Sequence, residues 1–214
     1  TNHVLNEEFL ASVAAGLRVS ASFSVSPDET IEYLLDKKPL FEAGKGFAYS
    51  DTNYILLAII IERVTGEACY DLIQRRLLLR GGISAVVPSD SPNISGLATG
   101  HWDPINNFFR IPSPTNRREN GELRYNPALE WAGGGYAASP KGLAMLAKLL
   151  YEYPSVDREL FDQMLETRSM AEFPTVKLRY GLGIMTYLST SGLFAMGHSG
   201  FFPGYRAEMY YFPE

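Results

Sequence analysis

The sequence predicts an α+β fold in which a mainly helical part precedes an antiparallel sheet. The chain has 214 residues, 46% of them hydrophobic and 20% charged, which is typical of a folded globular domain. Segments of helical period come first, and strand-like segments separated by turn residues come last. Because the two kinds do not alternate, a parallel βαβ sheet is not expected. We therefore expect one domain, mainly helical over residues 1–170 and made of sheet strands over residues 171–214.

Two helices are expected in the first 40 residues. The first, over residues 7–15, is short. The second begins at a strong signal, in which Ser26 is the N-cap, Pro27 takes the first helical position and Glu29 completes a capping box. Its pattern runs to about Lys38.

Two further helices are expected to end at glycines. Residues 51–65 read as a buried helix that stops at Gly66, and residues 68–80 read as a helix that stops at a Gly-Gly pair. Residues 83–135 have no clear periodicity and are rich in Pro, Asn, Ser and Gly. An irregular stretch of this length is usually either functional or wrongly assigned.

The last part of the chain changes from helices to strands. Ser139 and Pro140 repeat the cap-then-proline signal and open a helix to Tyr153, and one more helix is expected over residues 156–167. Three strands should follow, with turns at residues 189–192 and 203–204. The expected strands are 180–188, 193–198 and 206–212.

Composition and charge exclude several classes of function. The net charge is −5, and the nearest approach to a basic patch is three arginines on one predicted helix, so nucleic acid is not an expected partner. The apolar run at residues 54–61 is stopped by Glu62 and Arg63, so no membrane span is expected. Cys69 is the single cysteine, so no intrachain disulfide can form and cysteine use does not assign a compartment.

Neither a metal nor a cofactor is expected. The three histidines His3, His101 and His198 are far apart in sequence, and no H-E-x-x-H pattern or cysteine pair is present. The glycine run at residues 133–135 lacks the lysine that follows a phosphate-binding loop. We interpret it as a tight loop that lines a cleft.

The triplet Tyr49-Ser50-Asp51 is a candidate for chemistry. Tyr49 stands at the end of a glycine-containing loop and directly before a predicted helix, where its hydroxyl can face a cleft. A phenol is a poor base unless a neighbouring cation stabilises the phenolate. Taken alone, the triplet is better explained by a packing tyrosine.

The second candidate is the triplet His198-Ser199-Gly200, at the end of a predicted strand. His198 is able to donate a hydrogen bond or to carry charge near neutral pH. The small Ser199 and Gly200 let a substrate backbone approach the strand, so we expect them to contact substrate. Taken alone, the triplet also fits a structural histidine before a turn.

Together, the two triplets and their flanks resemble the serine β-lactamase and DD-peptidase superfamily, and most closely its class C β-lactamase-like serine hydrolases. Residues 38–54 are similar to the family's Y-x-N region, and residues 131–135 to its "AGG" segment. Residues 197–205 are similar to its "GHSGxxPG" segment, the equivalent of K-T-G. The resemblance covers most of the chain and implies the β-lactamase-like fold, with a sheet that this chain leaves incomplete.

The resemblance also implies roles for individual residues. Tyr49 would be the general acid and base that relays protons to and from a nucleophilic serine. Asp51 stands where the family commonly has Asn, which contacts the substrate amide and the active-site lysine. His198 would take the place of the K-T-G lysine, and the backbone N–H of Phe201 would donate to the oxyanion. The implied substrates are esters, β-lactams or D-amino-acid peptides, and the implied compartment is the periplasm or the cell exterior.

The chain departs from the family pattern in one essential respect. No serine is followed by lysine three residues later, so the S-x-x-K motif that holds the nucleophile is absent. We expect the chain to be an internal fragment that is inactive alone and whose nucleophile lies elsewhere. Its exposed strands are expected to associate with one another or with a separate N-terminal segment. The alternative is a non-catalytic binding or regulatory module on the same fold.

Overall fold

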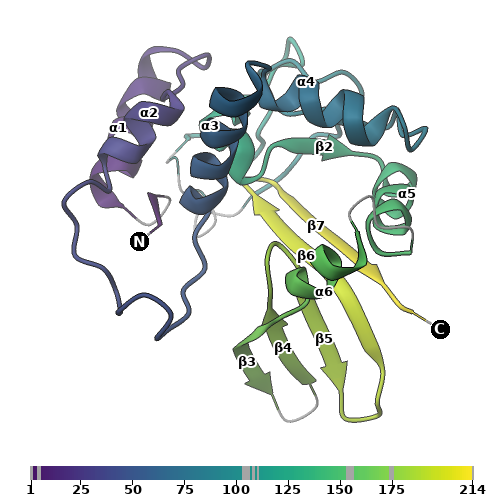
Figure 1. The fold of residues 1–214 in the computed structure, drawn as a ribbon. Helices are drawn as coiled ribbons and strands as arrows, with labels where there is room; N and C mark the ends of the chain where they lie inside the picture. The colour runs from purple at the N-terminus through teal and green to yellow at the C-terminus, as the bar shows by residue number, and fades with distance from the viewer. Residues whose placement is uncertain are drawn as a thin grey trace. The chain divides into compact units, whose positions relative to one another are not determined.

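The computed structural model describes most of the chain, namely residues 2–3, 6–102, 107, 109, 111–152, 157–173 and 176–213, with only the backbone of residues 168–173. The chain forms two compact units (Figure 1). The first unit comprises Thr1–Ile73, Val87–Ala137 and Phe202–Tyr205. The second unit comprises Gln74–Val86, Ala138–Phe201 and Arg206–Glu214. Helices precede the main antiparallel sheet, so the predicted α+β class is confirmed.

The first two helices begin at side-chain caps. Helix α1 (Glu7–Val19) is capped by Asn6, and α2 (Pro27–Glu32) has the predicted capping box between Ser26 and Glu29. The predicted extent of the second helix is wrong, since α2 ends at Glu32. The chain continues in turns, and Asp36 adopts a left-handed conformation with φ of 61°, which no helix accommodates.

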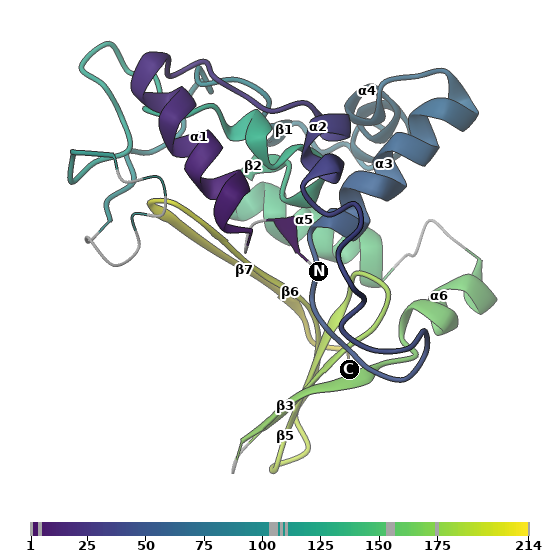
Figure 2. The ribbon, with the colours of Figure 1, turned by 90° about the vertical axis from the view of Figure 1, so that its left-hand side faces the viewer.

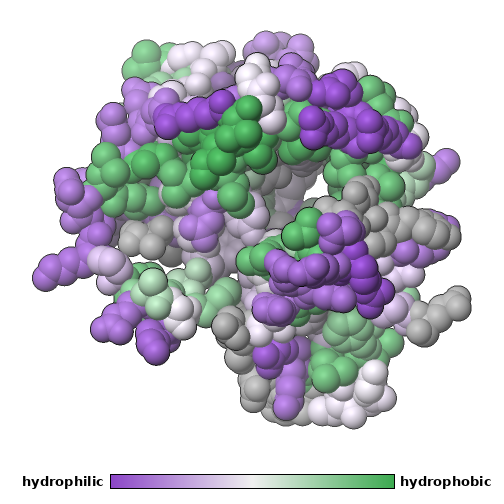
Figure 3. Space-filling model, in the orientation of Figure 1, coloured by the Kyte–Doolittle hydropathy of each residue, from purple (hydrophilic) through white to green (hydrophobic). Residues whose placement is uncertain are grey.

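Helix α3 (Thr52–Thr65) begins one residue after its predicted start and ends where predicted, at Gly66, which has the left-handed conformation with φ of 70°. The prediction that it is buried holds for one face only, formed by Thr52, Ile55 and Ala58. Its opposite face is apolar and exposed, and it contributes to the green surface over α3 in Figure 3. The exposed side chains are Leu56, Leu57, Ile60 and Val64.

The predicted helix over residues 68–80 is divided. Helix α4 (Cys69–Ile73) gives way to a π-helical stretch, Gln74–Leu78. The predicted irregular segment contains short elements: strands β1 (Val86–Pro88) and β2 (Tyr136–Ala138) pair with each other, and 3-10 helices span Pro127–Leu129 and Trp131–Gly133. Within the described residues, no helix is both long and apolar enough to cross a membrane.

The irregular segment is nevertheless well packed. Ile94, Ile111, Leu123 and Tyr125 form one core of the first unit, and Phe9, Val13, Val25 and Leu129 form another. In this segment a side chain takes the place of a backbone hydrogen-bond partner: Asn116 Oδ1 accepts a hydrogen bond from Gly100 N over 2.8 Å. Hydrogen bonds of this kind satisfy buried backbone N–H and C=O groups without helix or strand. The segment can therefore pack without a periodic pattern of apolar residues in its sequence.

A five-stranded sheet follows in the order β3-β4-β5-β6-β7, and each neighbouring pair from β3 to β6 is antiparallel. The strands are β3 (Arg168–Phe173), β4 (Val176–Tyr180), β5 (Met185–Ser189), β6 (Phe194–Phe202) and β7 (Tyr205–Tyr211). The predicted strand 180–188 begins too early: β5 starts at Met185, Tyr180 is the last residue of β4, and Gly183 between the two strands has φ of 75°. Strand β3 was not predicted, because its residues do not alternate between apolar and polar.

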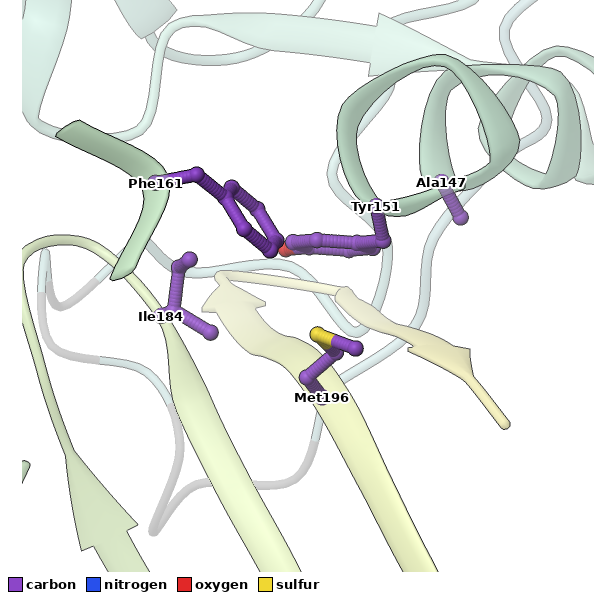
Figure 4. Packing of buried hydrophobic residues seen from close by; sticks show 5 residues of the cluster. All are labelled: Ala147, Tyr151, Phe161, Ile184 and Met196. Atoms are coloured by element: carbon purple, nitrogen blue, oxygen red, sulfur yellow. The ribbon is translucent and has the colours of Figure 1, made fainter. Parts of the chain in front are cut away.

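Two helices pack on this sheet in the second unit. Ala147 and Tyr151 of α5 (Pro140–Tyr151) and Phe161 of α6 (Arg158–Met164) meet Ile184 and Met196 in a buried cluster (Figure 4). Ser139 caps α5 as predicted, while the expected boundaries Tyr153 and Val156 lie outside the described residues. Strands β6 and β7 run side by side (Figures 1 and 2), as the predicted turn at residues 203–204 requires.

Candidate active site

Tyr49 and Asp51 lie together at the start of α3. The Tyr49 hydroxyl donates a hydrogen bond to Asp51 Oδ1 over 3.0 Å. Asp51 occupies the N-cap position of α3, yet its side chain makes no capping bond. Instead, its Oδ2 accepts from the Asn2 amide nitrogen over 2.8 Å. An aspartate at this position ordinarily caps the helix, so its carboxylate is committed to the site rather than to the helix.

The surroundings of Tyr49 favour a protonated phenol. Burial raises the pKa of Tyr49 well above its ordinary value, and the negative charge of Asp51 and the hydrogen bond to it raise this pKa further. Phenolate beside a carboxylate is strongly disfavoured. Within this arrangement Tyr49 is a hydrogen-bond donor, and it becomes a base only if a cation is brought against it.

Glu130 is a second carboxyl group beside Asp51. It lies between the two short 3-10 helices, and the following residue, Trp131, has an unusual φ of 39°. A Cβ atom placed on Gly133 would lie 3.1 Å from Glu130 Oε2 and 3.3 Å from Asp51 Cβ, so both residues border the same small space. Burial, and secondarily the charge of Asp51, raise the pKa of Glu130 to about 8.

Asn2 and His3 complete this group of side chains. His3 is fully buried, its Nδ1 lies 3.0 Å from Thr52 Oγ1, and its Nε2 lies 3.9 Å from Glu130 Oε2. Burial lowers the pKa of His3 to about 4, with partial opposition from Asp51, so the ring is neutral at pH 7. We call the five residues Asn2, His3, Tyr49, Asp51 and Glu130 the acidic cluster.

Sequence reasoning identified only two members of the acidic cluster. Asn2 carried no signal, and His3 was considered only as a distant metal ligand. Glu130 stands in the irregular segment, where nothing local marks a carboxylate as buried. The one available clue was the glycine run at residues 133–135, which predicted a tight loop at a cleft. Within the described ranges, no three His, Cys, Asp or Glu side chains are arranged to hold a metal ion.

His198 lies half-buried on β6 in the second unit and bonds through both ring nitrogens. Its Nδ1 contacts the carbonyl oxygen of Ser199, and its Nε2 lies 2.9 Å from the Tyr180 hydroxyl. Because a carbonyl only accepts, Nδ1 carries the proton of the neutral ring, and Nε2 accepts from Tyr180. Tyr180 is a buried partner that the sequence placed only in a strand.

The residues after His198 become progressively exposed. The Ser199 hydroxyl donates weakly to Met185 Sδ over 3.7 Å, while Gly200 and the side chain of Phe201 are exposed. Apart from the adjacent residues, the nearest neighbour of a Cβ atom placed on Gly200 would be Ala207 Cβ, at 3.9 Å, so the backbone here is approachable. This geometry is compatible with the predicted approach of a substrate.

The predicted site residues are divided between the two units. Tyr49 and Asp51 belong to the first unit, and residues 198–201 belong to the second. The structure brings Tyr49 and Asp51 together, as it does His198 and Ser199. That all of them line one cleft stays a prediction.

Comparison with known proteins gives a consistent family assignment. The family described as Beta-lactamase matches residues 9–214. Penicillin-binding protein 4* of Bacillus subtilis (strain 168) is 25% identical over an alignment of 174 residues, and the match covers 79% of this chain and 38% of the relative.

Solved structures show the same fold. The D-stereospecific amidohydrolase from Streptomyces sp. superposes with a TM-score of 0.81 and 20% identity, over 99% of this chain and 60% of that protein. The D-amino acid amidase from Ochrobactrum anthropi SV3, solved with L-phenylalanine amide, has a TM-score of 0.68 and 20% identity, over 85% and 51%. The octameric penicillin-binding protein homologue from Pyrococcus abyssi has a TM-score of 0.69 and 22% identity, over 99% and 48%. The chain thus spans roughly half of the length of each of these proteins.

Proposed function

Because the chain belongs to the beta-lactamase family, we propose that it is part of a serine hydrolase that acts through an acyl-serine intermediate. The observation that carries the proposal is the family match over residues 9–214, and Tyr49, bonded to Asp51 at the start of α3, is the group proposed to relay protons. The proposed substrates are esters, β-lactams, or amides and peptides of D-amino acids. The D-stereospecific amidohydrolase and the D-amino acid amidase support the last class by their fold.

We place the nucleophile outside this chain, because no S-x-x-K motif occurs within it. The lysine of that motif would place a cation beside Tyr49. A nearby ammonium lowers the pKa of a phenol, whereas the Asp51 carboxylate raises it, so the balance between the two sets how readily Tyr49 transfers a proton. Asp51 in place of Asn therefore makes Tyr49 more dependent on the lysine.

The second unit is proposed to supply the oxyanion side of the site. His198 would face the substrate in the place of the K-T-G lysine, and the Phe201 N–H would donate to the developing oxyanion. The Tyr180 hydroxyl orients the His198 ring through the 2.9 Å hydrogen bond to Nε2. Ser199 and Gly200 would lie alongside the bound substrate.

A covalent probe tests this function. The full-length protein that contains this chain is treated with a fluorophosphonate and its intact mass is measured. We expect a single adduct on a serine of an S-x-x-K motif, formed about 100-fold or more slowly in Tyr49→Phe, because general base catalysis contributes that much. Tyr33→Phe is the control, since the Tyr33 ring packs on Phe9 and Tyr33 is not a member of the acidic cluster. A full-length protein with neither the motif nor an adduct contradicts the proposal.

One observation favours the alternative of a non-catalytic binding module. Tyr49 is held as a donor by Asp51, which suits ligand binding better than proton abstraction. Under this alternative, a β-lactam would bind reversibly to the full-length protein and leave no adduct. Equilibrium dialysis followed by denaturing mass analysis separates the two functions.

We also propose that the chain self-associates through its sheet. The octameric Pyrococcus abyssi homologue sets a precedent within the fold. In the described sheet, β7 is an end strand with β6 as its single neighbour, and an end strand offers unpaired N–H and C=O groups. Light scattering on the purified chain should give a mass above 23.8 kDa, and a monomer would contradict self-association.

A further inference from the structure

We propose that Tyr125 and Asn116 are positioning residues for the oxyanion side of the site. They hold the turn between β6 and β7, and with it the backbone N–H of Phe201. The proposal rests on the proposed function, in which this N–H donates to the developing oxyanion. It gives part of the irregular segment, residues 83–135, a role in the reaction.

The carbonyl oxygen of Pro203, in the turn between β6 and β7, accepts two buried side-chain hydrogen bonds. The Tyr125 hydroxyl donates over 2.8 Å and the Asn116 amide nitrogen over 3.4 Å, from 78 and 87 residues earlier in the chain. Both residues are 0% exposed. Burial raises the pKa of Tyr125 well above its ordinary value, so the phenol keeps the proton that it donates. The turn is thus bonded to the irregular segment.

Asn116 is held in the orientation that this contact requires. Its Oδ1 accepts from Gly100 N over 2.8 Å, and a backbone N–H only donates. The amide nitrogen is therefore the atom that faces Pro203 O, which only accepts. The backbone N–H of Asn116 also donates to Gly100 O over 3.0 Å, so backbone and side chain are both fixed by the same residue.

Two glycines bring the backbone of the turn against the irregular segment. A Cβ atom on Gly100 would lie 2.4 Å from Gly204 O, and one on Gly204 would lie 2.8 Å from Asn116 Nδ2. Gly204 also has φ of 88°, which favours glycine. A larger residue at either position would push the turn away from the segment, so the contact is closely packed.

Aromatic residues on both sides of Pro203 add to this anchor. The ring centroids of Tyr125 and Phe202 lie 5.3 Å apart, and the Tyr205 hydroxyl donates to Ala98 O over 2.7 Å. The four residues Phe202–Tyr205 belong to the first unit, which also contains Tyr49. Contacts with the irregular segment therefore hold the whole turn.

The anchored turn matters for the reaction because Phe201 directly precedes it. An oxyanion donor stabilises charge only from a fixed position, and a displacement of about 1 Å costs about 100-fold in rate. The Phe201 side chain is exposed, so the peptide N–H depends on its backbone neighbours for its position. Release of the turn should thus lower the reactivity of the full-length protein and leave its fold in place.

Hydrogen exchange on the purified chain tests the anchor itself. Tyr125→Phe keeps the ring but removes the hydroxyl, so Pro203 O loses a donor. The backbone amides of β6 and β7 nearest the turn should then exchange about tenfold faster. Asn116→Asp should act in the same direction, since a carboxylate does not donate, but it also buries a charge, so Tyr125→Phe is the deciding variant.

The matched control is Tyr151→Phe. Tyr151 is also a buried tyrosine, 7% exposed, and it lies in the helix–sheet core of the second unit. Exchange at the β6–β7 turn should not change in this variant.

The rate of covalent labelling tests the positioning role. In the full-length protein, the fluorophosphonate concentration is varied to separate the maximal rate of adduct formation from the concentration that gives half of it. Tyr125→Phe should lower the maximal rate about tenfold or more and leave the half-saturating concentration and the final extent of labelling unchanged. A purely structural role would lower the extent of labelling, because unfolded molecules do not react, and would leave the rate of the folded ones as in the wild type.

Three results would overturn the proposal. Wild-type exchange at the turn in Tyr125→Phe would show that the bonds to Pro203 do not anchor it. Faster exchange with a wild-type labelling rate would show that the anchor does not position the oxyanion donor, while the adduct itself would leave the hydrolase proposal standing. A full-length protein that forms no adduct would remove the hydrolase proposal and this one with it.

Discussion

Replacing Glu130 by Gln should make the first unit more stable at alkaline pH. Gln has nearly the same shape as Glu but cannot ionise. The Glu130 carboxyl has a pKa of about 8 in the folded chain, compared with 4.5 for an ordinary glutamate. Between these values the unfolded chain has lost the proton and the folded chain has kept it. Folding therefore takes up a proton in this window, and stability falls as pH rises.

The size of the effect follows from the two pKa values. One proton gives a slope of about −1.4 kcal/mol per pH unit, so the whole window from pH 4.5 to 8 corresponds to about 5 kcal/mol. His3 acts in the opposite direction, because its folded pKa of about 4 is below its ordinary 6.5 and stability rises with pH between them. Above pH 6.5 the His3 contribution is constant. From there to pH 8, Glu130 alone should lower stability by about 2 kcal/mol.

Urea unfolding at half-unit intervals from pH 6 to 9 measures this loss. Both tryptophans, Trp102 and Trp131, belong to the first unit, so their fluorescence reports on the unit that contains Glu130. The wild-type midpoint should fall between pH 6.5 and 8, and that of Glu130→Gln should stay nearly level. Glu8→Gln should follow the wild type. Parallel pH profiles for wild type and Glu130→Gln would refute the conclusion that Glu130 is buried as a neutral acid.

Two further predictions concern the second unit. A Cβ atom on Gly197 would lie 1.8 Å from the Met209 carbonyl oxygen, so Gly197→Ala should cost about 3 kcal/mol or more in urea unfolding followed by circular dichroism. Gly200→Ala should cost less than about 1 kcal/mol, because the nearest neighbour there is 3.9 Å away, and equal losses would contradict the close β6–β7 approach. For His198, ¹⁵N NMR should show the neutral ring protonated on Nδ1, with the Nε2 signal moved by Tyr180→Phe. A ring protonated on Nε2 would refute the assigned hydrogen-bond directions.

The sequence by itself determined those features that depend on a few neighbouring residues. The capping box at Ser26, the end of α3 at Gly66 and the start of α5 at Ser139 all follow from caps and from glycine conformation. The order of helices and strands follows from local periodicity. The short motifs around Tyr49 and His198 were sufficient to indicate the family, because they are contiguous.

Only the tertiary structure decided which side chains share an environment. Asn2 precedes Asp51 by 49 residues and Glu130 lies far beyond it in sequence, and nothing near either residue marks it as a neighbour of Asp51. Likewise, the pairing of His198 with Tyr180 depends on the register of the sheet, which a turn between β4 and β5 sets. Burial is a property of the packed chain, and burial is the main cause of the shifted pKa values of Glu130 and His3. A sequence shows which residues are able to ionise, whereas the fold decides at what pH they do.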